Sequence, residues 1–186
     1  MKTDITRVLM EEHQLILRMI DLLEHNSARM ERGNFSEWKF FADALDFIRT
    51  FADRHHHAKE EDVLFLALVE NGMPAQRSPI EAMHIEHEQG RAHVRNMDIA
   101  LQQIRAGETA QTQTLAQHAR AYAELLREHI EKEDTILYPL AERVLPQNMR
   151  PEIVEGYTQA DTHAPKVAQT YRALVEHYEA ARSAAA

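Results

Sequence analysis

Residues 129 to 139 read His-Ile-Glu-Lys-Glu-Asp-Thr-Ile-Leu-Tyr-Pro, and a looser copy of them at residues 56 to 66 reads His-His-Ala-Lys-Glu-Glu-Asp-Val-Leu-Phe-Leu. Both stretches contain His-x-x-x-Glu followed by an apolar turn. A second repeated element lies upstream, because Glu12-His13 precedes the first stretch at nearly the distance by which Glu86-His87 precedes the second. The chain therefore consists of two similar halves, each with one separate His and one His-x-x-x-Glu.

The composition favours one helical domain. A chain of 186 residues is long enough to bury a substantial core. Only 5 Gly and 6 Pro interrupt a sequence rich in Ala, Leu, Glu and Gln, which favours helices over many short strands. The absence of Cys excludes disulfides, thiolate zinc sites, iron–sulfur clusters and cysteine nucleophiles.

The charge and hydropathy limit the partners and the location. A formal net charge of -9 opposes contact with nucleic acid or with an anionic membrane surface, so we expect neither as a partner. The chain contains no apolar run of membrane-spanning length and begins without the apolar segment of a secretory signal, so we expect a cytoplasmic protein. The 12 His residues are the unusual feature of the composition.

Capping and stop signals predict four long helices and a fifth helical segment. Helix starts are expected near Asp4, after Asn34, at Ser78-Pro79 and near Thr109, with Gly33, Gly72 and Gly107 as stops. The fifth segment should reach about Arg182, with an interruption near Pro165. We therefore expect an all-α fold, an up-down-up-down four-helix bundle over residues 1–146 with a C-terminal helical extension, residues 147–186, packed on the same domain.

The two His-x-x-x-Glu motifs lie on the predicted apolar stripes of their helices. Residues four apart share a helix face, so a His and a Glu at this spacing can reach one point. A single such motif is equally typical of a surface ion pair, but an unpaired imidazole or carboxylate on an apolar stripe would carry a large desolvation cost. A bound cation, protonation or mutual hydrogen bonding would each offset that cost. The stripes are expected to continue through Val63 and Ala67 in the first half and through Ile136 and Leu140 in the second.

Six side chains are expected to converge inside the bundle. A donor set of four imidazoles and two carboxylates is too rich in nitrogen for magnesium or calcium and too large for one tetrahedral zinc. Inward Glu and His on facing helices are instead typical of carboxylate-bridged metal pairs. We therefore predict two non-haem iron ions, for which zinc or manganese could substitute, bridged by the two glutamates and held by His13, His56, Glu60, His87, His129 and Glu133.

Other polar residues near these positions are second candidates, as further ligands or as groups around the ligands. His57 has Asp53 and Glu61 at helical spacing, which predicts a surface residue in a row of ion pairs. Carboxylates next to the motifs are expected to orient the ring N–H groups of the histidines. Aromatic residues before His129 on the same face are expected to be core residues, with lining of the open side of the site as the alternative. The second candidates are His84, Asp134, Glu61, His57, Tyr122 and His118.

Together, these motifs resemble the hemerythrin-like, or HHE cation-binding, family over roughly residues 4 to 145. The resemblance implies a four-helix bundle that holds a non-haem di-iron centre, with the six residues named above at the positions of family ligands. The residues that carry the resemblance are Glu12-His13, His56-His57-x-x-Glu60-Glu61 with Leu64-Phe65, Glu86-His87-x-x-Gly90-Arg91, and His129-Ile130-x-Lys132-Glu133-Asp134 with Leu137-Tyr138-Pro139.

Two departures from the oxygen-carrying hemerythrins bear on function. The carriers have five His ligands, two of them four apart on the third helix, whereas Met83 and Arg91 occupy the corresponding positions around His87 and His84 is the only local substitute. The carriers also use His-x-x-x-x-Asp on the fourth helix, which Asp134 satisfies, although the internal repeat favours Glu133. The remaining four-His, two-carboxylate pattern is similar to the di-iron repair proteins of nitrosative stress, which typically carry a Cys-containing domain, and to iron- or oxygen-sensing hemerythrin domains.

Three classes of function follow in order of preference. The first is a di-iron protein that handles or senses a small ligand (oxygen, NO or peroxide) or iron, in stress protection or sensing. The second is a di-iron enzyme of peroxide or NO detoxification or of iron-centre repair. Such an enzyme would be identified if the iron-loaded protein consumed peroxide or NO faster than free iron does. The third is a helical interaction module, whose thermal midpoint a chelator would leave unchanged. The sequence does not identify catalytic residues or an oligomeric state.

Overall fold

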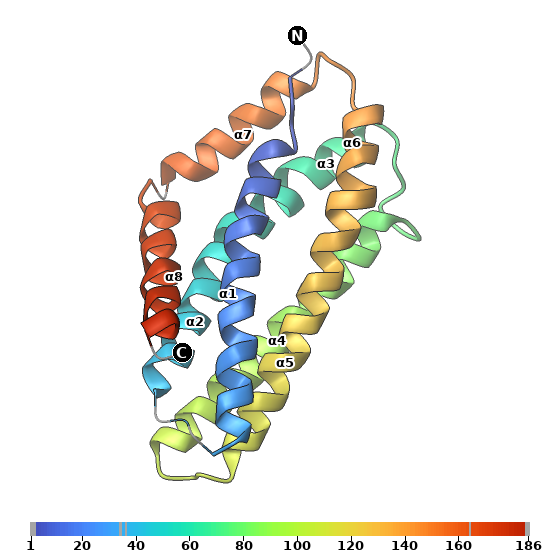
Figure 1. The fold of residues 1–186 in the computed structure, drawn as a ribbon. Helices are drawn as coiled ribbons and strands as arrows, with labels where there is room; N and C mark the ends of the chain where they lie inside the picture. Colours follow the sequence, from blue (N-terminus) through green and yellow to red (C-terminus); the bar gives the residue numbers. More distant parts are fainter. Residues whose placement is uncertain (1–2, 34, 36, 164, 185–186) are drawn as a thin grey trace.

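The computed structural model of the protein describes residues 3–33, 35, 37–163 and 165–184. All regular structure in this part of the chain is helical, so the predicted all-α fold is confirmed (Figure 1). No helix in the same part is both long enough and apolar enough to span a bilayer. The elements are α1 (Arg7–Glu31), α2 (Trp38–Phe47), η1 (Ile48–His57), η2 (Glu60–Leu64), α3 (Phe65–Glu70), α4 (Pro79–Arg105), α5 (Gln111–Lys132), η3 (Glu133–Leu137), α6 (Tyr138–Val144), α7 (Arg150–His163) and α8 (Val167–Ala184), where η marks a π-helical segment.

Most helix ends within the described residues lie where the capping and stop signals predict them, while the predicted cap at Asn34 lies outside those residues. Pro79 is the first residue of α4, and the Ser78 hydroxyl accepts a hydrogen bond from the backbone N–H of Glu81 at 3.4 Å. Gly33, Gly72 and Gly107 follow helix ends with positive φ, a conformation that costs glycine little. Helix α1 begins at Arg7, a little later than expected, because the Asp4 carboxylate instead accepts hydrogen bonds from the N–H groups of Thr6 and Arg7.

The π-helical segments change which residues face inward after each His-x-x-x-Glu motif. A π-helix forms i→i+5 hydrogen bonds, so each segment places an extra residue in the turn. The expected stripe was therefore wrong beyond Glu133, because Ile136 is 58% exposed while Leu137 is buried. After Glu60, Leu64 rather than Val63 is fully buried, whereas Ala67 is buried as predicted. In each half, a leucine four residues after the glutamate of the motif, Leu64 or Leu137, is therefore buried.

The long helices lie side by side (Figure 1). Helix α5 packs against both α1 and α4, and α2 packs against α4. The helical stretch from α2 to α3 runs through η1 and η2 without a loop, as does the stretch from α5 to α6 through η3. Both motifs therefore lie in the middle of continuous helical stretches, where neighbouring helices surround them.

The apolar interior is divided into two clusters. One contains Ile16, Phe51 and Leu126, and the other contains Leu9, Phe65 and Leu137, with more residues of the same kinds around each. In every long helical stretch the buried His and Glu residues fall in sequence between members of the two clusters. The core therefore contains a polar layer with apolar packing on both sides.

Helices α7 and α8 pack on the outside of the long helices. Tyr171 and Val175 of α8 are buried in the first apolar cluster, and Arg18 of α1 forms two hydrogen bonds with Glu179 of α8 at 2.9 and 2.6 Å. Helix α7 lies against η2, with Tyr157 buried in the second cluster. The division of the chain at residue 146 into a bundle and an extension stays a prediction.

The close approach of α7 to η2 depends on Gly156. A Cβ atom at this position would lie 2.9 Å from Cγ1 and 3.1 Å from Cγ2 of Val63, a β-branched side chain that moves little. Alanine in place of glycine ordinarily stabilises a helix by about 1 kcal/mol. We expect Gly156→Ala instead to lower the free energy of unfolding, measured by urea denaturation, by about 1 to 3 kcal/mol because of overpacking.

Gly90→Ala is the matched control, because a Cβ there would lie at an ordinary 3.5 Å from Cε2 of Tyr122. This control should be neutral or stabilising, and Val63→Ala should restore the stability of Gly156→Ala. Equal stabilisation by both glycine substitutions would show that α7 does not pack this closely.

Candidate metal centre

The six side chains predicted as ligands lie together in the polar layer. Each is at most 2% exposed. They come from helices that are distant in sequence: α1, α4, the stretch around η1 and η2, and the junction of α5 with η3. Burial of this many ionisable groups in one place is costly unless they are paired or bind a cation. The six residues are His13, His56, Glu60, His87, His129 and Glu133.

The two carboxylates lie between the imidazoles. Oε2 of Glu133 is 3.3 Å from Nε2 of His13 and 3.2 Å from Nε2 of His129. Oε2 of Glu60 is 3.8 Å from Nε2 of His56 and 3.5 Å from Nε2 of His87. Each carboxylate thus contacts one imidazole from the first half of the chain and one from the second, which is the placement expected of a bridging ligand.

A shell of carboxylates holds the Nδ1 atoms of the same four histidines. Glu12 contacts Nδ1 of His56 at 2.9 Å, and Glu86 contacts Nδ1 of His129 at 2.9 Å. Asp134 contacts Nδ1 of His13 at 2.8 Å, and Glu61 contacts Nδ1 of His87 at 2.6 Å. A carboxylate on Nδ1 fixes the ring and leaves Nε2 as the inward atom, an arrangement typical of metal-binding histidine.

This shell follows the internal repeat of the sequence. Glu12 and Glu86 each hold the His of the motif in their own half, whereas Glu61 and Asp134, which follow Glu60 and Glu133, each hold the separate His of the other half. A lysine supports each glutamate, since Lys59 donates to Glu12 and Lys132 donates to Glu86. Glu12 and Glu86 were not among the predicted site residues, although their position directly before His13 and His87 was a usable signal.

The histidines of the layer differ in charge when no cation is bound. Burial alone lowers the pKa of His13, but the carboxylates of Asp134 and Glu133 raise it to about 10 overall. Burial, together with the neighbouring ring of His57, lowers the pKa of His87 to about 4. The carboxyl of Glu61, although burial opposes this, is held by His87 and Arg91 at a pKa of about 2. At neutral pH, His13 is therefore protonated, His87 is neutral and the neighbouring Glu61 is ionised.

Three carboxylate oxygens at the centre of the layer suit a metal ion. Within the described part of the chain, Oε2 of Glu60 and both side-chain oxygens of Glu133 are buried and accept no hydrogen bond. Buried carboxylate oxygens without such partners carry a desolvation penalty. The surrounding Nε2 atoms and these oxygens form a mixed N and O donor set that iron, zinc or manganese accepts. The residues present therefore fit a metal centre.

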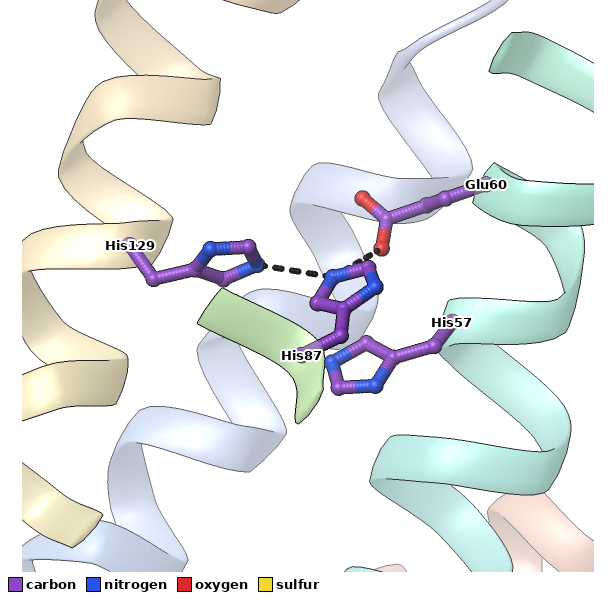
Figure 2. A group of neighbouring side chains, drawn as sticks. All are labelled: His57, Glu60, His87 and His129. Atoms are coloured by element: carbon purple, nitrogen blue, oxygen red, sulfur yellow. Dashed lines mark hydrogen bonds and ion pairs between the residues drawn. The ribbon is translucent and has the colours of Figure 1, made fainter. Parts of the chain in front are cut away.

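His57 is buried at 6% exposure, so the prediction of a surface residue was wrong. Its ring stacks on that of His87 with 3.8 Å between centroids, and it lies in a group with Glu60 and His129 (Figure 2). The predicted contact with Asp53 is present, at 3.3 Å from Nδ1. The error arises from η1, whose π-helical hydrogen bonding lets three consecutive histidines, His55 to His57, be buried.

The other second candidates occupy different positions. His84 is exposed, near Glu61 and His87 but outside the buried layer. His118 is half-buried and contacts His93, with 3.0 Å between their Nδ1 atoms. Tyr122 is buried at 3% exposure, and it lines a cavity next to the layer.

That cavity has a volume of about 200 Å³ and reaches one side of the layer. His57, His87 and His129 lie on its wall, together with the apolar side chains of Val94 and Leu125. It offers a small molecule a largely apolar space next to the imidazoles.

Tyr138 contacts the layer without lining that cavity, and it was not predicted as a site residue. Its hydroxyl donates a short hydrogen bond to Oε1 of Glu60 and lies 3.3 Å from Nε2 of His13. In the repeat, Tyr138 corresponds to Phe65, so the first half of the chain has no equivalent hydroxyl.

Comparison with known proteins gives the family. Residues 4–141 match the hemerythrin HHE cation binding domain, and the chain belongs to this family. Uncharacterized proteins of Mycobacterium bovis and Mycobacterium tuberculosis are 24% identical to it over 137 residues, which is 74% of this chain and 53% of each relative. The chain thus spans about half the length of these curated relatives. No solved structure matches the chain.

The hydrogen bond from Tyr138 to Glu60 predicts a measurable contribution to stability. Tyr138→Phe leaves a further oxygen of a buried carboxylate without a donor, and we expect the metal-free protein to lose about 1 to 3 kcal/mol of unfolding free energy in urea denaturation. Tyr157→Phe is the matched control, because Tyr157 is also buried, at 3% exposure, and its hydroxyl has no hydrogen-bond partner in the described chain. Equal effects of the two substitutions would contradict the assigned role of the Tyr138 hydroxyl.

Proposed function

We propose that this protein is a non-haem di-iron protein that handles or senses a small ligand (oxygen, NO or peroxide) or iron, built on an up-down-up-down four-helix bundle. The observation that carries the proposal is the set of buried oxygens of Glu60 and Glu133 that accept no hydrogen bond from the described residues and lie inside a ring of inward Nε2 atoms. Membership of a cation-binding family supports the same conclusion.

The proposed ligands are the six residues of the prediction. His13 and His56 would hold one ion, His87 and His129 the other, with Glu60 and Glu133 as bridges. Both carboxylates contact imidazoles of both pairs, which supports their bridging role. Asp134 contacts the outer nitrogen of His13 and not the centre, so we propose Glu133 rather than Asp134 as the ligand. Zinc or manganese could occupy the same donors.

Bound iron would supply redox chemistry and a place for a small molecule to coordinate. The protein's own part is to hold the imidazoles in one tautomer through Glu12, Glu86, Glu61 and Asp134, and to keep bulk water away by apolar packing on both sides. The cavity of about 200 Å³ beside His57, His87 and His129 has room for a small molecule next to the imidazoles, with charged side chains such as Arg91 also on its wall. Diatomic molecules and peroxide fit this description.

An enzyme that consumes peroxide or NO is the second candidate, and the same cavity supports it. Steady-state consumption by iron-loaded protein separates the two proposals. A rate above that of free iron would identify an enzyme, whereas reversible spectral changes on ligand addition without turnover would identify a binding or sensing protein.

Metal content tests the site directly. Protein made in iron-replete cells and purified without oxygen should contain close to two irons per chain by elemental analysis. His129→Ala and Glu60→Ala should each lower this content sharply, because each removes a donor to the centre. His118→Ala is the control, since His118 lies outside the layer and should leave the content unchanged.

Stability gives a second readout of the same proposal. Removing the metal with a chelator should lower the thermal midpoint, because an ion that binds only the folded chain stabilises it. Equal metal content in all variants together with an unmoved midpoint would leave the layer as a set of self-paired polar residues and would end the proposal.

A further inference from the structure

We infer that His93 and His118 form a second, separate metal site, which binds one late first-row divalent ion, copper(II) most tightly. This site lies outside the polar layer, so the inference goes beyond the proposed di-iron centre. His93 lies more than one turn after His87 on α4, and His118 lies about three turns before His129 on α5. The two rings meet between these neighbouring helices.

The first observation is the distance between the two rings. Nδ1 of His93 lies 3.0 Å from Nδ1 of His118, and both side chains are half-buried, so solvent ions can reach them. Two bonds of about 2.0 to 2.1 Å from one ion to imidazole nitrogens, at a right angle, would place those nitrogens about 2.9 Å apart. Neighbouring donors at a right angle are typical of tetragonal copper(II) and nickel(II) sites. The pair therefore has the spacing of a two-histidine chelate.

The second observation is the protonation of the pair. In the contact between the two Nδ1 atoms, one ring donates its N–H and the other accepts it. The donating ring can carry the same proton on Nε2, and this change of tautomer leaves both Nδ1 atoms free to bind an ion. Burial and then the neighbouring His118 lower the pKa of His93. The surroundings thus favour the neutral imidazole, which is the form that binds metal.

The third observation is that the fold does not require histidine at these positions. In the sequence repeat, Met19 corresponds to His93, and Leu45 corresponds to His118. Both are core residues, at 1% and 3% exposure, and Ala44 beside Leu45 is buried as well. The first half of the chain thus has apolar side chains where the second half has two imidazoles, whose partial burial carries a desolvation cost. A bound ion would offset this cost.

Two substitutions test the site, because they introduce the apolar residues that the first half of the chain uses. They are His93→Met and His118→Leu. We would dialyse metal-free protein against copper(II) near neutral pH and measure bound copper by elemental analysis. The polar layer is unchanged in both variants and contributes equally, so the wild type should bind one more copper ion per chain than either variant.

The affinity at the pair gives a more exacting result. Loss of either imidazole should weaken binding of this ion at least about a hundredfold, since the second imidazole of a chelate binds the same ion intramolecularly. The electron paramagnetic resonance spectrum of the wild type minus that of His93→Met should show copper(II) coupled to two nitrogens. Circular dichroism tests folding, and if one variant does not fold, the other decides.

Two further variants serve as controls. His177→Ala removes a single exposed histidine of α8 and should bind as much copper as the wild type. His129→Ala changes the polar layer and should keep the copper ion at the pair. Iron(II) lies below copper(II) in the order of metal affinities, so the pair should not add to the iron content of the protein.

The possible failures are distinguishable. Equal copper binding by the wild type, His93→Met and His118→Leu would overturn the inference and leave the di-iron proposal intact. Loss of copper in His129→Ala alone would also overturn it, because the bound copper would then lie in the polar layer. A wild type that binds no iron but keeps the extra copper ion would end the proposed function and support this inference.

Discussion

The structure depends on the cost of keeping ionisable groups away from water in the middle of the protein. Two carboxylates and four imidazoles lie in one layer, with apolar clusters on both sides. The outer nitrogen of each of these imidazoles is paired with a carboxylate, while Glu60 and Glu133 retain oxygens that accept no hydrogen bond from the part of the chain that the structure describes. These carboxylate oxygens lie where the four helical stretches meet. A bound cation would offset the desolvation cost of burying them.

The π-helical segments allow apolar side chains to pack in the interior directly after the buried polar residues of this layer. They lie at both His-x-x-x-Glu motifs and insert a residue in the turn that follows the glutamate. The apolar residues beneath the motifs, Leu64 and Leu137, thereby return to the interior. The longer η1 also buries His57, which makes the two halves unequal despite their similar sequences.

The C-terminal helices create a second difference between the two halves of the chain. Lys59 and Lys132 hold equivalent positions in the repeat, yet Lys59 is fully buried and contacts Asp161 of α7 at 2.6 Å, whereas the Lys132 side chain is 38% exposed. Helix α7 thus covers the support of His56. The support of His129 stays near the surface, on the side where the cavity of about 200 Å³ meets His57 and His87. The layer thus adjoins α7 on the side of Lys59 and the cavity on the side of His129.

The sequence by itself determined the all-α fold, most helix ends and the six residues of the layer, because helix caps and four-residue spacing act locally along the chain. It also indicated Glu133 over Asp134 through the repeat. Tertiary structure alone decided the rest. The burial of His57, the exposure of Ile136 and the pairing of Glu12 with His56 depend on π-helical turns and on contacts between residues far apart in sequence. The expectation that Glu61 and Asp134 orient ring nitrogens came from the sequence, but their partners, His87 and His13, did not. Spacing within one helix carries no information about hydrogen bonds that form between helices.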